Sequence, residues 1–166
     1  MPPQLSTRSV TRDDLAAIAA LHARCFGPGR FTRSAYRVRE GTPAISRFCR
    51  AAFLDQRLVA ALRFTNVEIG GVGGAVLLGP LAVDPDFAGK GFGRRLVEEG
   101  IADARKAGLK LVVLVGDMPY YGRFGFAPVP PGQIVFPGPV DPARILALEF
   151  EAGALAGFTG RVAAEK

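Results

Sequence analysis

The sequence is poor in the residues that build metal centres and disulfide frameworks. Among 166 residues it holds two cysteines, Cys25 and Cys49, and one histidine, His22. Two cysteines are too few for a disulfide framework, and no CxxC spacing for zinc occurs. His22 and Cys25 lie three positions apart without a third ligand, so we interpret them as packing residues. These scarcities lead us to expect a reduced, cytoplasmic protein that binds no metal.

Long apolar runs are also missing. The longest, from Gly73 to Val83, has 11 residues and is interrupted by glycine and proline, whereas a bilayer-spanning helix needs about 20 apolar residues. The start, Met1 to Leu5, has no basic stretch followed by an apolar core, so we expect no signal peptide. With 49% hydrophobic residues and no repeat, the chain is expected to form a single domain over residues 1–166 without a membrane partner.

Glycine and positive charge are abundant instead. The chain has 21 glycines and 13 prolines, and 21 Lys and Arg against 15 Asp and Glu give a net charge of +6. This surplus favours an anionic partner, such as a nucleic acid or a phosphorylated cofactor. A nucleic-acid-binding module should interleave basic residues with exposed aromatics, but the aromatics here are mostly phenylalanines at core-like positions. We therefore expect no nucleic acid partner.

Hydrophobic periodicity predicts an α/β (mixed α+β) protein. Strands are expected over residues 6–10, 48–54, 58–67, 75–83, 111–115, 126–129 and 145–151, and helices over 15–25, 32–40, 91–107 and 118–124. Hairpins combined with one strand–helix–strand crossover indicate a mixed sheet with helices on both faces. Pro80 cannot donate a ladder hydrogen bond, so the strand over 75–83 should be bulged or splayed there.

A glycine-rich turn joins that strand to the helix over 91–107. It reads Gly89-Lys90-Gly91-Phe92-Gly93-Arg94-Arg95. Glycines permit close approach to exposed backbone N–H groups, and a helix N-terminus adds partial positive charge, so the turn suits a phosphate. A Rossmann pattern would need glycine at Arg94, and a P-loop would need Ser or Thr at Gly91. Both of these phosphate motifs are therefore excluded.

Two motifs resemble those of a known family. The segment from Val83 to Leu96, with the glycine turn at its centre, is similar to the acetyl-CoA-binding motif of the GCN5-related N-acetyltransferases (GNAT). The segment Tyr121-Gly122-Arg123-Phe124-Gly125-Phe126 is similar to the family's second signature, Tyr-x-x-x-Gly-Phe. Together with Val115-Gly116-Asp117, they resemble a bacterial branch of predicted, largely uncharacterised acetyltransferases. The resemblance implies a GNAT-like fold, with a mostly antiparallel sheet of about six or seven strands, splayed at the cofactor site.

The resemblance also implies acetyl-CoA as the acetyl donor, without a metal. The pantetheine arm would pair with the splayed strand through the backbone of Leu81, Ala82 and Val83. The pyrophosphate would lie on the glycine turn, held by Ala88, Gly89, Lys90, Gly91, Phe92, Gly93 and Arg94. Ala88 stands where the family has Gln or Arg. It can still offer its backbone N–H, but it cannot brace the loop with a side chain.

Transfer of an acetyl group to an amine needs a neutral amine, a stabilised oxyanion and a protonated leaving thiolate. The resemblance assigns the acid role to Tyr121, with Tyr120 as the alternative, and the oxyanion to a backbone N–H of the splayed strand at Val83 or its neighbour. Three sources for the general base stay open: Glu68, in a region where some relatives place a carboxylate, Asp117, and a water chain.

The resemblance predicts an N-acetyltransferase whose acceptor is a primary amine of a small molecule or a peptide. Its identity is left open, as is the formation of a homodimer. Four arginines lie in or beside the second predicted helix: Arg30, Arg33, Arg37 and Arg39. They either form a solvated face of that helix or attract an acidic acceptor. The alternative to an enzyme is a non-catalytic sensor that binds acetyl-CoA or CoA with the same fold.

Overall fold

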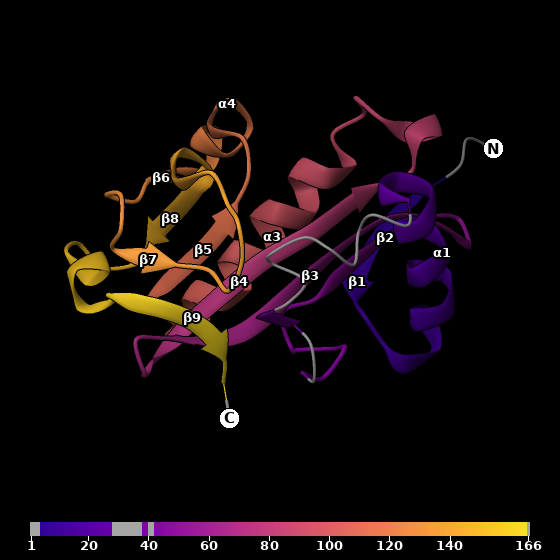
Figure 1. Ribbon diagram of the computed structural model, residues 1–166. Helices are drawn as coiled ribbons and strands as arrows, with labels where there is room; N and C mark the ends of the chain where they lie inside the picture. The colour runs from indigo at the N-terminus through magenta and orange to yellow at the C-terminus, as the bar shows by residue number, and fades with distance from the viewer. Residues whose placement is uncertain (1–3, 28–37, 40–41, 166) are drawn as a thin grey trace.

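A mixed nine-stranded sheet forms the framework of the described residues, which in this computed structural model are 4–27, 38–39 and 42–165 (Figure 1). The strands run in the order β1-β2-β3-β4-β5-β8-β6, while β9 pairs with both β3 and β7. Neighbours are antiparallel except for the parallel pairs β4–β5 and β7–β9. The strands are β1 (Leu5–Ser9), β2 (Arg50–Leu54), β3 (Arg57–Ile69), β4 (Val72–Val83), β5 (Leu111–Val115), β6 (Ala127–Pro128), β7 (Ile134–Val135), β8 (Ile145–Glu149) and β9 (Gly160–Ala164).

The predicted fold class is confirmed, with two strands more than the sequence indicated. β7 has only two residues, and β9 buries a single large apolar side chain, Val162. Such short or weakly alternating segments give no clear period-two pattern, so they depend on the neighbouring strand for their conformation. β9 lies along the end of β3, where Glu68 is opposite Ala163.

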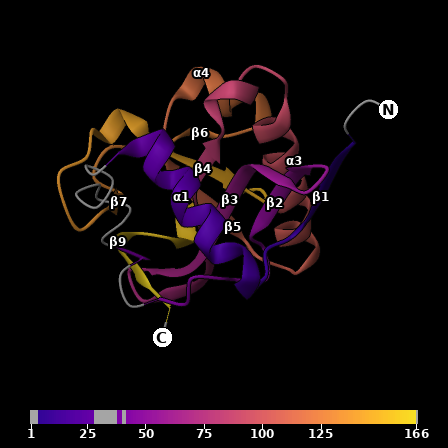
Figure 2. The same ribbon diagram turned by 90° about the vertical axis from the view of Figure 1, so that its right-hand side faces the viewer.

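The long helices cover opposite faces of the sheet (Figures 1 and 2). α3 (Phe92–Lys106) packs its buried stripe on Phe64 and its neighbours in the core. Gly100 makes this possible, because a Cβ there would lie 2.3 Å from the Phe64 ring. α1 (Leu15–Phe26) places Leu21 against Ala61 and Ala82 on the other face. These small residues let α1 lie close to β3 and β4.

Shorter helical segments lie between the strands. α4 (Met118–Tyr121) and η4 (Gly122–Phe124) follow β5, as predicted for residues 118–124. Most of the helix predicted over 32–40 lies outside the described residues, apart from Val38 and Arg39, which are helical and buried. No helix in the described part of the chain is long and apolar enough to cross a membrane.

Asp84 fastens α1 to the end of β4. It is 1% exposed and accepts two hydrogen bonds from Arg24 of α1, at 2.7 and 3.0 Å, and one from Arg57 of β3 at 3.2 Å. Its carboxylate also caps η3 (Pro85–Phe87) by accepting from the Asp86 N–H. Burial alone raises the pKa of the Asp84 carboxyl, but these hydrogen bonds outweigh burial and hold the pKa below its ordinary value. Asp84 thus sets where the glycine turn begins.

Replacing Asp84 is therefore expected to destabilise the protein in a pH-dependent way. Asp84→Asn should lower the free energy of unfolding at pH 7 by about 2 kcal/mol, since it removes charged hydrogen bonds. Because the pKa of Asp84 in the folded protein lies below the ordinary value of an aspartate, the carboxylate stabilises the fold above that ordinary value, and its contribution is lost as the pH falls through the lowered pKa. Urea unfolding from pH 7 to 3 should show the two proteins converging. Asp86→Asn, at an exposed carboxylate, is the matched control.

Candidate active site

β4 separates from β5 halfway along its length. The two strands pair only from Ala75 to Leu77 of β4, while β5 continues to pair with β8 up to Val115. On its other side β4 stays paired with β3, with a bulge that sets Gly79 and Pro80 opposite Arg63. The Gly79–Pro80 peptide is cis. The predicted splay at Pro80 is confirmed, and among the described strands none pairs with this edge of β4 beyond Leu77.

The splayed edge presents alternate backbone groups. The Asp84 N–H donates to the Val59 carbonyl of β3 at 2.8 Å, so Asp84 and, two residues back, Ala82 turn their backbone groups toward β3. Leu81 and Val83 turn theirs toward the open edge. The Cys25 thiol of α1 donates to the Val83 carbonyl at 3.3 Å. Of the three residues predicted for pantetheine, Leu81 and Val83 have the suitable orientation, whereas Ala82 serves the sheet.

The glycine turn leads from this edge into α3. Gly89 and Gly91 have φ of +77° and +83°, a left-handed conformation that glycine adopts at little cost, and Gly91 is the N-cap of α3. The first hydrogen bond of the helix runs from the Arg95 N–H to the Gly91 carbonyl. The N–H groups of the preceding residues in the first turn have no carbonyl of the helix to pair with, and together with the helix dipole they suit an anion.

Gly93 holds the start of α3 against the splayed strand. A Cβ at this position would lie 3.0 Å from a methyl of Val83, 3.4 Å from one of Leu81 and 3.3 Å from the Tyr120 hydroxyl. Only glycine leaves room for this approach. The structure therefore brings the open edge of β4, the N-terminus of α3 and the second tyrosine motif together.

The side chains of the turn are engaged elsewhere or exposed. Arg94 Nε donates to Glu98 Oε1 at 2.8 Å, and Phe92 packs its ring toward Phe87. Lys90 is exposed. The Ala88 N–H donates to the Pro85 carbonyl at 3.4 Å, closing η3. The groups of the turn that could meet a phosphate are thus chiefly the backbone N–H groups of the first turn of α3, and the N–H of Ala88 is already used within η3.

The two tyrosines of α4 point to different places. Tyr121 lines a cavity beside the splayed edge, where its ring passes so close to Gly116 that a Cβ there would lie 2.6 Å away. Tyr120 faces Gly93 at the start of α3. Burial raises the pKa of the Tyr120 hydroxyl, against the opposing effect of the nearby cations Arg123 and Arg94. Of the two tyrosines only Tyr121 lines this cavity, and its role as the acid stays a prediction.

The cavity has a volume of about 390 Å³ and mixes charges of both signs with apolar walls. It is lined by Phe26, Arg39, Leu78, Gly79, Pro80, Leu81, Val115, Gly116, Asp117, Tyr121, Pro139, Val140, Asp141 and Arg144. The contributions from residues 139–144 carried no signal in the sequence, because they come from an irregular, proline-rich segment. The walls of the cavity come from the splayed strand, the end of β5, the segments that follow β5 and precede β8, the end of α1, and Arg39.

Comparison with known proteins now identifies the family. The acetyltransferase (GNAT) domain matches residues 6–129. The chain belongs to this family, and is an acyltransferase. The uncharacterised N-acetyltransferase YjhQ of Escherichia coli is 31% identical to this GNAT chain over 134 residues, which are 77% of this chain and 72% of YjhQ.

Solved structures of GNAT proteins agree in fold. The E. coli protein YhbS, in complex with CoA, is 27% identical with a TM-score of 0.81, covering 99% of this chain and 92% of YhbS. An acetyltransferase from Brucella melitensis, in complex with acetyl-CoA, is 27% identical with a TM-score of 0.73, covering 98% and 96%. The resemblance carried by the two sequence motifs is therefore confirmed at the level of the family and its fold.

The two carboxylates considered as general base lie far apart in this GNAT domain. Asp117 lines the cavity next to Tyr121 and pairs with Arg144 at 3.2 Å. Glu68 lies toward the other end of β3, between the pairs Val67–Ala75 and Ile69–Val72, with Ala163 of β9 opposite. The cavity instead adjoins the part of β4 that begins at Leu78. The structure does not bring Glu68 to the site.

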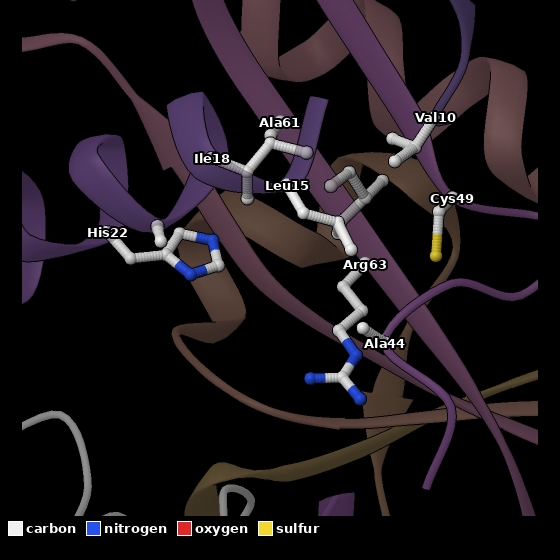
Figure 3. Close-up of a pocket in the computed structure, with 10 residues that line it drawn as sticks. Val10, Leu15, Ile18, His22, Ala44, Cys49, Ala61 and Arg63 are labelled. Carbon is white, nitrogen blue, oxygen red and sulfur yellow. The ribbon is translucent and has the colours of Figure 1, made fainter. Parts of the chain in front are cut away.

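A second cavity lies between α1 and β3 in this GNAT domain, with a volume of about 250 Å³ (Figure 3). Its walls are apolar, apart from His22, Arg63 and the thiol of Cys49. Arg63 donates to the Thr42 hydroxyl and to the Pro43 carbonyl, at 3.0 and 3.1 Å. The splayed edge and the tyrosines are absent from its walls. In the described part of the chain no group of three or more possible metal ligands occurs, at His22 or elsewhere.

Proposed function

We propose that this chain transfers an acetyl group from acetyl-CoA to a primary amine. One observation carries the proposal: the splayed edge of β4 meets the N-terminus of α3 at Gly93, and Tyr121 lines the cavity beside the same edge. The two GNAT structures described above hold CoA or acetyl-CoA. This chain fits such a group, since Gly93 leaves the start of α3 within contact of the open strand edge.

The backbone would hold the cofactor. The first-turn N–H groups of α3 would take the pyrophosphate, and Leu81 and Val83 would pair with pantetheine along the open edge. When bound, acetyl-CoA supplies the thioester whose acetyl carbon exchanges sulfur for the nitrogen of the amine. A strand-edge N–H, at Val83 or Leu81, would stabilise the charge that develops on the acetyl oxygen. No side chain from the turn is required for any of these roles.

Side chains at the cavity would move the protons. The Tyr121 hydroxyl would donate a proton to the departing sulfur. Asp117 is the carboxylate on the same cavity, and it would take the proton of the attacking amine directly or through water. Direct attack needs no residue of the chain to carry the acetyl group covalently. A free-thiol release assay with acetyl-CoA and a panel of primary amines tests the function, because CoA should appear only when an accepted amine is present.

The choice between the two carboxylates has a measurable consequence. Asp117→Asn should lower kcat/KM for the amine about 10-fold, because it removes the proton acceptor at the cavity. Glu68→Gln should change it less than about 2-fold, since Glu68 is at the β9 end of β3. Steady-state kinetics of both variants with the same amine decide the matter. A larger loss in Glu68→Gln would return the base role to Glu68.

A further inference from the structure

The second cavity, between α1 and β3, offers apolar surface to a ligand. Val10 and Ala61 in its walls are buried, and α1 contributes the half-buried side chains of Leu15 and Ile18 (Figure 3). An apolar cavity of roughly 150 Å³ can bind benzene. With a volume of about 250 Å³, the second cavity is therefore large enough for an aromatic ring or for an alkyl chain of similar size.

Polar groups in the walls of the second cavity are engaged with the protein itself. The Arg63 guanidinium donates to the Thr42 hydroxyl and to the Pro43 carbonyl. The Cys49 thiol accepts from the Phe64 N–H at 3.4 Å and donates to the Phe64 carbonyl at 3.6 Å. Because a buried polar group of a ligand costs free energy unless it finds a partner, these walls favour a hydrocarbon group over a charged one.

Two elements lead from the second cavity to the cavity beside the splayed edge. On α1, His22 lines the second cavity and Phe26 lines the other, and their ring centroids are 5.8 Å apart. On the sheet, Arg63 of β3 lines the second cavity, whereas Gly79 and Pro80, opposite it in the bulge of β4, line the other. The two cavities are therefore neighbours along α1, about one helical turn apart.

We propose that the acceptor is a hydrophobic primary amine, whose alkyl or aryl group lies in the second cavity while its nitrogen reaches Asp117 and Tyr121. This inference rests on the proposed function. The transfer forms a bond from the nitrogen to the acetyl carbon and breaks the carbon–sulfur bond of acetyl-CoA, while the nitrogen loses one proton and the sulfur gains one. An amino alcohol or a diamine sets a polar group against the apolar walls, so the site discriminates against both.

The test compares amines of equal length that differ at the far end. Hexylamine, 5-amino-1-pentanol and 1,5-diaminopentane have the same number of non-hydrogen atoms, and they are assayed by thiol release with acetyl-CoA. Hexylamine should exceed both polar amines about 10-fold or more in kcat/KM. From propylamine to hexylamine, kcat/KM should rise about 3-fold for each added methylene. Equal or faster turnover of the polar amines, or no rise with chain length, would overturn the inference and leave the acetyltransferase function standing.

Two alanines of α1 supply a variant that fills the second cavity and a matched control. Ala19 and Ala20 are both exposed, but of the two only Ala19 lines the cavity. Ala19→Phe should raise KM for hexylamine about 10-fold and leave kcat/KM for propylamine nearly unchanged, because the new ring takes the place of the longer chain. Ala20→Phe should leave both amines unaffected. Equal losses for hexylamine and propylamine in Ala19→Phe would indicate a general disturbance of α1 and would also overturn the inference.

A binding measurement decides the inference if no amine in the panel is acetylated. The protein saturated with CoA is then titrated with hexylamine and with 1,5-diaminopentane, and the change in Tm is recorded. Stabilisation by hexylamine alone, lost in Ala19→Phe and kept in Ala20→Phe, supports the apolar site even though the proposed function has failed. Any other pattern overturns the apolar site as well.

Discussion

Gly91→Glu is expected to abolish the rise in Tm that acetyl-CoA produces, and to weaken binding of the cofactor about 100-fold or more. The substitution places a carboxylate at the N-cap of α3, where the proposed site holds the pyrophosphate. Two negative charges at one helix N-terminus repel each other in place of the attraction that the backbone N–H groups supply. Differential scanning fluorimetry with and without acetyl-CoA measures the effect.

The substitution also strains the backbone, so it needs a matched control. A Cβ at Gly91 has no other atom within 4 Å, but its φ of +83° disfavours any side chain. Gly153 has φ of +85°, is equally open and caps the short helix η6 (Ala154–Gly157). Gly153→Glu should therefore show the same loss of intrinsic stability with a full response to acetyl-CoA. An undiminished response in Gly91→Glu would remove the phosphate from this turn.

Tyr121→Phe is expected to lower kcat about 100-fold while leaving the affinity for acetyl-CoA unchanged. The hydroxyl is the proton donor in the proposed transfer, whereas the ring, which packs against Gly116 and Phe126, is retained. Steady-state kinetics with the preferred amine measure kcat, and calorimetry measures cofactor binding. A fall in kcat together with a loss of affinity for acetyl-CoA would indicate a structural role for Tyr121 instead.

Tyr120→Phe is the informative comparison. Its hydroxyl lies next to Gly93 at the start of α3 rather than in the cavity. We therefore expect a higher KM for acetyl-CoA and a kcat within about 3-fold of the unmodified protein. A large fall in kcat for Tyr120→Phe, with full activity in Tyr121→Phe, would exchange the roles of the two tyrosines.

The local elements of the cofactor site could be predicted because their causes are local. Pro80 withholds a ladder hydrogen bond, so the splay follows from one residue type in one strand. Gly89 and Gly91 adopt the left-handed turn, and the apolar stripe of α3 marks the helix behind it. The sequence could not show that the backbone groups of Leu81 and Val83 point to the open edge while those of Ala82 point to β3. That orientation depends on which residues of β3 and β4 form the hydrogen-bonded pairs.

The acceptor side depends on contacts between distant segments. The family resemblance offers Glu68 as a base because some relatives place a carboxylate in that region, but the length of β3 carries it to the β9 end, away from Leu78 and the cavity. Asp117 and Arg144 meet across 27 positions of sequence. Arg39 was one of several arginines of undecided role, of which Arg30, Arg33 and Arg37 lie outside the described residues. Its burial beside Gly79 appears only in the folded chain.

The proposed reaction moves an acetyl group from acetyl-CoA to a primary amine. The most direct measurement is mass spectrometry of the amines after incubation with the protein and isotopically labelled acetyl-CoA. We expect one labelled acetyl group on the nitrogen of an accepted amine, in step with CoA release, and nearly none with Tyr121→Phe. Tight binding of acetyl-CoA without labelled product from any amine would contradict it and would identify the chain as a non-catalytic CoA-binding domain.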